Sequence, residues 1–298
     1  MYQKRYAPLF PTPTADPIAA FLAGLSYIER RRWLRKNVAS PYPRFLYRYT
    51  KLEPDKEESV RHLRQTLVDS ELWLSSPTEF NDPFDMSFEV VFSGNGARKR
   101  NVLDHKFKEL FPQVGWVQRK KRINQMMAEP SKTLARIQNS FRNNFGGCGV
   151  CCFTPNPKNL LMWSHYAASH TGIVLQFHPA CDPGIFTRPA PVVYSDHYPT
   201  VDWANDTFGE IRKALFVKSS HWQYENEWRI IHPAGANTKL IFGASALTGI
   251  ITGCRASDET ISTLIALLDE RNKKGLPAIA LYKAAKHPSE FRLTAMRM

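Results

Sequence analysis

Residues 151–177 read CCFTPNPKNLLMWSHYAASHTGIVLQF, and this stretch decides the fold class. Branched and aromatic residues predict strands over 149–154 and 172–177. Between them, the turn residues around Pro155 and Pro157 separate the first strand from a short helix over 159–169. Strands and helices are therefore mixed in this part of the chain.

The rest of the core shows the same irregular mixture. We predict helices over 57–69 and 258–272. Further strands are expected over 45–50, 72–75, 192–195, 228–232, 239–242, 249–252, 279–282 and 291–295. Because these elements do not alternate as strand, helix and strand, the pattern favours an α+β fold with a split, mostly antiparallel sheet and helical additions.

Two segments look like additions to this core. Residues 1–43 form an N-terminal helical extension in our interpretation, because prolines precede a helix that would begin at Asp16-Pro17. The arginines that end this helix suit the negative end of a helix dipole. The core domain is expected over 44–298, with a basic helical insertion at about 97–144.

Composition narrows the protein class. With 43% hydrophobic residues in a chain of 298, disorder over the whole length is excluded. No apolar run approaches the roughly 20 residues that span a bilayer, so no membrane association is expected. No secretory leader is visible and the cysteine count is odd, which predicts a cytoplasmic protein with reduced thiols. The net charge of +13 favours a nucleic acid or an acidic protein as partner.

Glu225 and Glu227 are the strongest candidates for catalytic groups. If they lie on a strand edge, residues two apart point to the same side. Two adjacent carboxylates repel, so one pKa should rise unless Arg229 or another cation pairs with it. Such a pair suits a general base or a group that stabilises positive charge, although an exposed salt bridge on a strand would have the same sequence.

The predicted helix around Trp163 is the second candidate feature. Met162, Trp163 and Tyr166 share one helix face, while His165 points elsewhere. This face is either packed into the core or forms an aromatic platform beside a cleft, where it could stack a planar ring.

Four blocks in this order resemble a bacterial family called domain of unknown function 2971. They are FLYRYT at 45–50, LWLSSPTEFNDPFD at 72–85, the quoted stretch at 151–177, and HWQYENEWRII at 221–231. The resemblance extends from about residue 45 to the C-terminus. The family name implies no activity.

A second resemblance suggests a mechanism. ADP-ribosyltransferases of the arginine–serine–glutamate type have an arginine on an early strand, a Ser/Thr motif on a middle strand, and a Glu-x-Glu motif before an apolar strand. Arg48, Thr154 and the pair Glu225 and Glu227 are similar in order. The middle motif departs from the usual Ser-x-Ser, and Tyr47 or Tyr49 could equally occupy the position of the arginine.

This resemblance implies NAD as the substrate. Glu227 would stabilise the positive charge that develops on the ribose, and Glu225 would position the acceptor. Arg48 would bind the pyrophosphate. The acceptor would be a nucleic acid, another acidic target, or water. We expect one cleft to be lined by all the candidate residues, which are Arg48, Thr154, Trp163, His165, Tyr166, Glu225 and Glu227.

Two alternatives remain open from the sequence. In a metal-dependent nuclease, Asp82, Asp85, Glu225 and Glu227 would bind magnesium, although no lysine follows Glu227 at the usual spacing. In a non-catalytic module, the basic insertion would bind nucleic acid or protein, and both acidic blocks would be architectural. The NDPFD loop is expected to be mainly structural, with Phe84 in the core.

Overall fold

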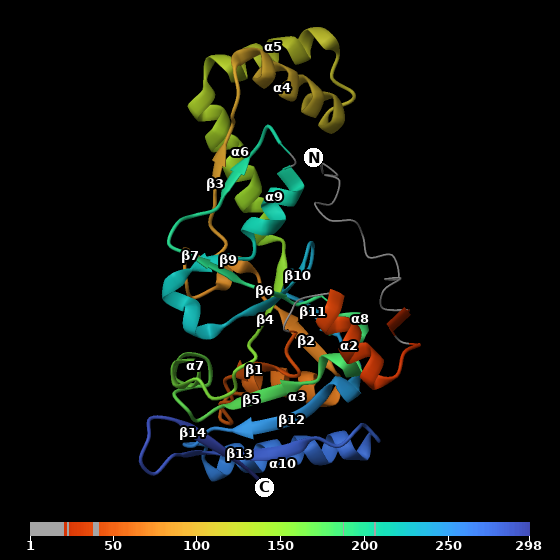
Figure 1. Ribbon diagram of the computed structural model, residues 1–298, viewed down its shortest axis with the longest axis vertical. Coiled ribbons are helices and arrows are strands. Elements are labelled where there is room, and N and C mark those ends of the chain that lie inside the picture. The colour runs from red at the N-terminus through yellow and green to blue at the C-terminus, as the bar shows by residue number, and fades with distance from the viewer. Residues whose placement is uncertain (1–20, 23, 38–41, 187, 206) are drawn as a thin grey trace.

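The computed structural model describes residues 21–22, 24–37, 42–186, 188–205 and 207–298. The molecule is elongated, with α4 (Gly96–Leu110) and α5 (Trp116–Ala128) at one end and α10 (Asp258–Lys273) at the other (Figure 1). None of the helices in these residues combines the length and the apolar composition that crossing a membrane requires.

The largest sheet has five strands in the order β1-β5-β12-β13-β14. They are β1 (Leu46–Thr50), β5 (Ile173–Phe177), β12 (Leu247–Thr252), β13 (Ala280–Lys286) and β14 (Leu293–Arg297). Neighbours are antiparallel except β12 and β13, which run parallel and are joined through α10. Each strand overlaps a predicted one, because branched and aromatic runs mark strands that a sheet buries.

A second sheet carries part of the candidate site. Its central strand β10 (Trp228–His232) lies antiparallel between β4 (Gly149–Phe153) and β6 (Ala190–Pro191). Single bridges, Tyr47 to Thr154 and Ser75 to Val150, join the β4 region to its neighbours. Three further pairs are β2 (Glu71–Leu74) with β11 (Thr238–Ile241), β3 (Glu89–Val91) with β8 (Thr200–Asp202), and β7 (Val193–Ser195) with β9 (Val217–Ser219). The predicted α+β class with a split, mostly antiparallel sheet is confirmed.

Helices bury the faces of these sheets in three clusters of apolar side chains. The largest cluster joins α3 (Glu57–Val68) and α10 to the five-stranded sheet through Leu63, Leu67 and Leu264. A second lies between α6 (Pro130–Gly146), α9 (Thr207–Ala214) and the strands β3 and β8. The third packs α7 (Leu160–Tyr166) against β1 and β5. Two short helices complete the fold, α2 (Tyr27–Asn37) and α8 (Pro183–Phe186).

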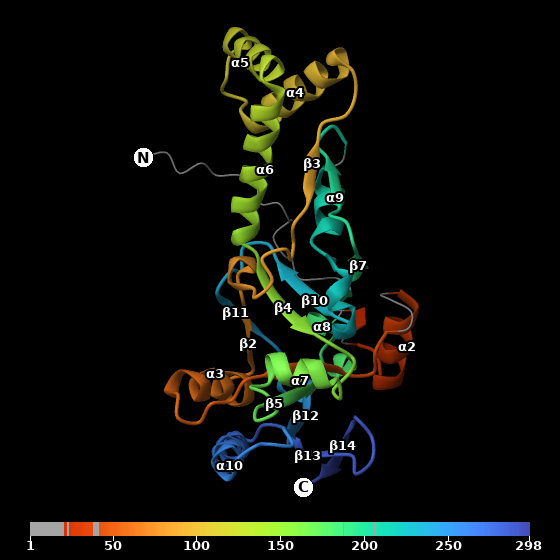
Figure 2. The ribbon, with the colours of Figure 1, turned by 90° about the vertical axis from the view of Figure 1, so that its left-hand side faces the viewer.

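The segment at 97–144 is helical, as its sequence indicates. It forms α4, α5 and most of α6, and Figure 2 shows α6 rising from the sheets toward the two shorter helices. The predicted helix start at Asp16-Pro17 lies outside the described residues. The division of the chain at residue 43 stays a prediction.

Acidification should loosen the contact between α2 and the core. The Tyr27 hydroxyl shares a hydrogen bond with His178 Nε2. Burial, aided by the charges of Arg31 and Arg44, lowers the pKa of His178 to about 4 from 6.5. The folded state therefore resists protonation, and the stability due to neutral His178 is lost as the pH falls from about 6.5 toward 4. Hydrogen exchange of α2 at pH 7 and 4.5 should show faster opening at the lower pH.

Replacing His178 by asparagine removes the titrating group and serves as the control. This variant should show little pH dependence of α2 exchange between the same two values. If wild type and variant respond alike, another group controls the contact.

Candidate functional site

A groove of about 780 Å³ lies beside β1, between α3, β2 and α7. This volume falls within the roughly 300–1,000 Å³ of typical small-molecule sites. Arg48 and Tyr49 line it from β1, and Tyr166 lines it from α7. The groove thus brings together three of the residues that the sequence predicted for cofactor binding.

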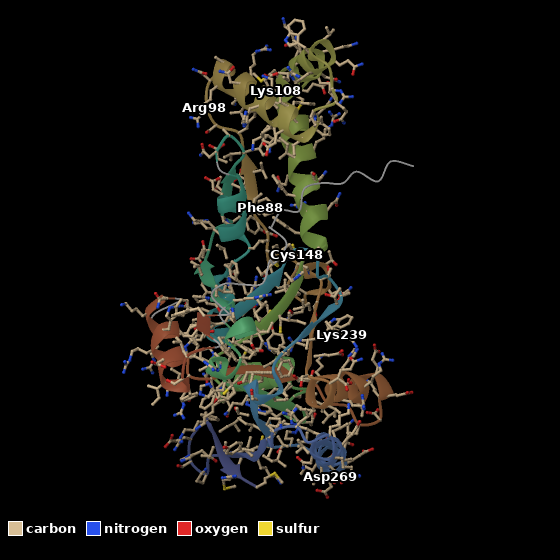
Figure 3. The ribbon with its side chains drawn as sticks, turned by 90° about the vertical axis from the view of Figure 1, so that its right-hand side faces the viewer. Phe88, Arg98, Lys108, Cys148, Lys239 and Asp269 are labelled. Carbon is tan, nitrogen blue, oxygen red and sulfur yellow. The ribbon has the colours of Figure 1, made fainter. Side chains whose placement is uncertain are left out.

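The groove is mixed in charge. Lys56 binds Glu53 at 2.6 Å, and Lys239 binds Glu71 at 2.7 Å. Lys239 is marked in Figure 3 beside the lower body of the molecule. Outside these pairs, the lining contributes the cations of Arg48 and Lys51.

Two further rings of the lining are already stacked on each other. His62 and Trp73 have ring centroids 5.9 Å apart and planes inclined by 22°. The groove therefore offers aromatic surface as well as cationic groups, which are the two kinds of contact that a nucleotide uses.

Tyr166 connects this groove to the acidic pair. Its hydroxyl donates a hydrogen bond to Glu225 Oε1 at 2.6 Å. The helix that carries Tyr166 begins at the cap Asn159, whose side-chain oxygen accepts from the amides of Leu161 and Met162. The same asparagine donates through Nδ2 to the Tyr224 carbonyl at 2.7 Å, so one capping residue fixes both partners of the contact.

The local backbone around the two glutamates differs from the predicted strand. Glu225 ends the 3₁₀ helix η3 (Ser220–Glu225), and Glu227 directly precedes β10. Asn226 between them is left-handed, with φ of 44°. Asparagine tolerates this conformation better than most residues do. The prediction that both glutamates lie on a strand was therefore wrong. The turn at Asn226, and not the alternation of side chains along a strand, brings the two carboxylates together.

Lys218 holds both carboxylates. Its Nζ lies 2.6 Å from Glu225 Oε2, 3.1 Å from Glu227 Oε2 and 3.5 Å from Asp85 Oδ2. The lysine comes from β9, whose neighbour β7 contributes Tyr194, and the Tyr194 hydroxyl accepts from the Glu227 amide at 2.7 Å.

Arg229 completes the arrangement from β10. Its Nε donates to Glu227 Oε1 at 2.6 Å, and its Nη2 donates to Asp85 Oδ2 at 2.6 Å. Its Nη1 reaches the Leu215 carbonyl at 3.2 Å. We call Lys218, Arg229, Asp85, Glu225 and Glu227 the ion cluster. With three carboxylates and two cations whose side chains are at most 6% exposed, it is a buried network.

The two glutamates differ in acidity. Burial raises the pKa of Glu225, and Lys218 and Tyr166 only partly oppose this. Burial acts on Glu227 too, but Arg229 and Lys218 outweigh it and lower its pKa to about 2. One pKa is raised, as predicted, but the main cause is burial and not repulsion between the carboxylates, and the rise occurs although Lys218 pairs with Glu225. Glu225 is therefore the member suited to exchange a proton.

The other predicted site residues do not line the groove. Trp163 is fully buried and donates to the Pro157 carbonyl at 2.9 Å, so its ring is part of the core and cannot stack on a ligand. Thr154 is also buried. His165 is exposed and pairs with the Tyr224 hydroxyl at 3.1 Å. Glu225 and Glu227 are buried and are not part of the lining either. The expectation of a single cleft lined by all the candidate residues is thus wrong, and for Trp163 the reason is that the aromatic helix packs this face inward.

The NDPFD loop forms the predicted turn, but Phe84 does not enter the core as predicted. Asp82 Oδ1 accepts from the Phe84 amide at 2.9 Å, which closes an Asx turn. Phe84 is 63% exposed, so the prediction that it enters the core was wrong. The turn instead directs Asp85 into the ion cluster.

The carboxylates proposed as magnesium ligands have other partners. Asp85, Glu225 and Glu227 bind Lys218 and Arg229 of the same chain. Within the described residues, no three or more His, Cys, Asp or Glu side chains are grouped so as to hold a metal ion.

Sequence reasoning missed Lys218. It stands alone in the segment Phe216-Val-Lys-Ser219, without a motif around it. Its partner Asp85 lies more than a hundred residues earlier in the chain. The signal that could have found it is the apolar run directly before the lysine, Leu215-Phe216-Val217, because such a run indicates a short buried strand.

Comparison with known proteins is consistent with the resemblance to the family of unknown function. Residues 162–230 match the family model described as "Protein of unknown function (DUF2971)". Neither a search of curated proteins nor a search of solved structures found a match to this chain. The matched segment extends from α7 into β10 and includes Tyr166. It also includes four members of the ion cluster, which are Lys218, Glu225, Glu227 and Arg229.

Proposed function

We propose that the protein is an ADP-ribosyltransferase-like enzyme that cleaves NAD between nicotinamide and ribose. The observation that supports this most is the hydrogen bond from Tyr166, in the groove, to the buried Glu225. Through the Tyr166 hydroxyl, a nucleotide in the groove would be connected to Glu225, a carboxylate with a pKa that is raised by burial. The order of Arg48, Thr154 and the Glu225 pair along the chain supports the same chemistry by resemblance.

The roles of the two glutamates follow from their partners. Glu227 is neutralised by Arg229 and Lys218, so we assign it a positioning role rather than the direct role that the resemblance implied. Glu225 shares Lys218 and contacts Tyr166, so it is the carboxylate nearest to the groove lining.

The proposed reaction breaks the bond between nicotinamide and ribose and forms a bond between ribose and the acceptor. The bond between the ribose C1′ and the nicotinamide nitrogen breaks, and its electron pair leaves with nicotinamide. The charge that develops on the ribose is stabilised by Glu225 through Tyr166. An acceptor hydroxyl or water attacks C1′ and gives its proton to the Tyr166 hydroxyl oxygen, while the Tyr166 proton passes to Glu225 Oε1, whose raised pKa favours a base. Arg48 and Lys51 line the groove, and we assign them to the pyrophosphate. Arg48 would then bind it with the part of its guanidinium that does not contact Cys151 and the Trp73 carbonyl.

Nicotinamide release from NAD by the purified protein, with and without single-stranded DNA, tests the proposal. Glu225→Gln should reduce the rate about 100-fold, the low end for loss of a proton-transferring group. Tyr166→Phe should reduce it as well, because the connection between groove and carboxylate is lost. Asp269→Asn serves as the control, because Asp269 is exposed on α10 and is not part of the groove lining.

Stability separates catalysis from architecture in the same variants. A carboxylate with a raised pKa adds little to folding at neutral pH, so Glu225→Gln should unfold near the wild-type temperature. A variant that loses both activity and stability would point to an architectural role. Wild-type protein that leaves NAD intact under both conditions would overturn the proposal.

A further inference from the structure

The helical end of the molecule carries most of its excess charge. Residues 96–128, which we call the arm, form α4, α5 and their connection. They hold nine Lys and Arg residues and two Asp and Glu residues, so seven of the chain's 13 net positive charges lie in this short segment. Both views place the arm beyond α6, at the end of the molecule away from β1, α3 and α7, which line the groove (Figures 1 and 2).

The arm has its own small scaffold. Leu103 of α4 and Ile123 of α5 are buried. Arg119 binds Asp104 at 2.7 Å, and Arg100 binds the Asn124 side chain at 2.6 Å, so polar contacts also join the two helices. Substitutions on the outer surface of the arm should therefore leave its fold intact.

Several cations of the arm lie where the helix dipole does not favour them. Arg98, Lys99 and Arg100 lie in the first turns of α4, and residues 119–122 lie in the first half of α5. Cations at a helix N-terminus oppose the dipole, whereas those at a C-terminus complement it. The last turn of α2, with Arg35 and Lys36, shows the favourable arrangement. Lys108, in the last turn of α4, has that favourable place and also pairs with Asp104. The cations of the first turns are thus not explained by the helix dipole, and they favour an external anion.

The arm carries exposed cations and an exposed aromatic ring. The exposed cationic side chains are Arg98, Arg100, Lys108, Lys120, Lys121 and Arg122. Figure 3 shows Arg98 and Lys108 at this end of the molecule. Trp116 begins α5 and is 62% exposed, with Lys120 Nζ 4.9 Å from its ring centroid. Val117 beside it is 72% exposed.

From this combination we infer that the arm binds single-stranded nucleic acid. Clustered cations neutralise phosphates, and an exposed indole beside a lysine can stack on an unpaired base. A duplex keeps its bases stacked and would use the cations alone, so the exposed Trp116 favours the single strand. This inference concerns a surface separate from the groove and does not depend on NAD cleavage.

Fluorescence anisotropy with a labelled oligothymidylate tests the inference on the full chain. Lys120→Glu/Lys121→Glu/Arg122→Glu should weaken binding at least about 10-fold and make the salt dependence of log K shallower by about 2, since single strands contribute roughly 0.7 per phosphate contact. Lys273→Glu/Lys283→Glu/Lys286→Glu changes the net charge equally on exposed positions of α10 and β13 and should bind nearly as wild type.

Trp116→Ala separates stacking from charge. It should weaken binding of the oligothymidylate by about 10-fold while leaving the salt dependence unchanged. An unlabelled mixed-sequence duplex should compete poorly. Equal competition by the duplex together with wild-type affinity of Trp116→Ala would overturn the single-strand assignment. Equal losses in the two triple variants would show that net charge, not the arm, governs binding.

Discussion

Replacing Arg229 by methionine is expected to lower the free energy of unfolding by about 3–5 kcal/mol, the range for breaking a buried ion pair. The guanidinium is fully buried and binds Glu227 and Asp85, each at 2.6 Å. Methionine fills a similar volume but leaves two buried carboxylates with less compensation. Urea unfolding followed by circular dichroism measures the effect.

The variant Arg64→Met is the matched control. Arg64 also joins two acidic residues, Asp69 at 2.9 Å and Glu270, but its side chain is 39% exposed. Solvent screens the charge of such an exposed cation, so this substitution should lower stability far less than Arg229→Met does. Similar losses in the two variants would show that burial does not set the strength of the ion cluster.

The loss in Arg229→Met should also depend on pH. Glu227 has a folded pKa of about 2, below its ordinary value of 4.5. Its contribution is therefore present above about pH 4.5 and is lost as the pH falls toward 2. Wild type and Arg229→Met should converge in stability over that interval, because protonated Glu227 no longer needs the guanidinium.

The sequence predicts the fold better than the site, for a physical reason. Strands such as β5 and β12 are runs of branched residues, and that local signal survives in any packing arrangement. A cluster such as Lys218 with Asp85 depends on which loops meet, and no local pattern records this. The Asx turn at Asp82 follows from its residue types, whereas the outward direction of Phe84 depends on the tertiary packing around the loop.

The pair Glu225 and Glu227 shows the same division. Spacing and the neighbouring Arg229 indicate that one carboxylate is neutralised and the other is not. Assigning the raised pKa to Glu225 requires knowing that Arg229 binds Glu227 twice while Glu225 has Lys218 and Tyr166. The burial of Trp163 likewise depends on which face of α7 meets Tyr49 of β1.

Replacing Lys218 by methionine is expected to destabilise the protein by about 3–5 kcal/mol at neutral pH. The lysine lies within 3.5 Å of all three carboxylates of the ion cluster, and Glu227 and Asp85 keep Arg229 when it is removed. Glu225 keeps only the Tyr166 hydroxyl. Most of the loss should therefore come from one buried carboxylate without a cation.

A second substitution tests that attribution. Glu225→Gln in the Lys218→Met background removes the uncompensated charge, so the double variant should be more stable than Lys218→Met alone. The exposed pair Lys56 and Glu53, also 2.6 Å apart, supplies the control. Lys56→Met and Lys56→Met/Glu53→Gln should each unfold at nearly the wild-type urea concentration.

The pH dependence of Lys218→Met identifies the same group independently. Burial already raises the pKa of Glu225, and removal of Lys218 raises it further. A carboxyl group whose folded pKa exceeds its unfolded value destabilises the folded state increasingly as the pH rises above the unfolded value. Lys218→Met should therefore be less destabilised at pH 5 than at pH 8, and Glu225→Gln should abolish the difference. A loss that is equal at both pH values and persists in the double variant would place the effect on packing of the lysine chain, and Glu225 would then not be the group that Lys218 keeps ionised beside the groove.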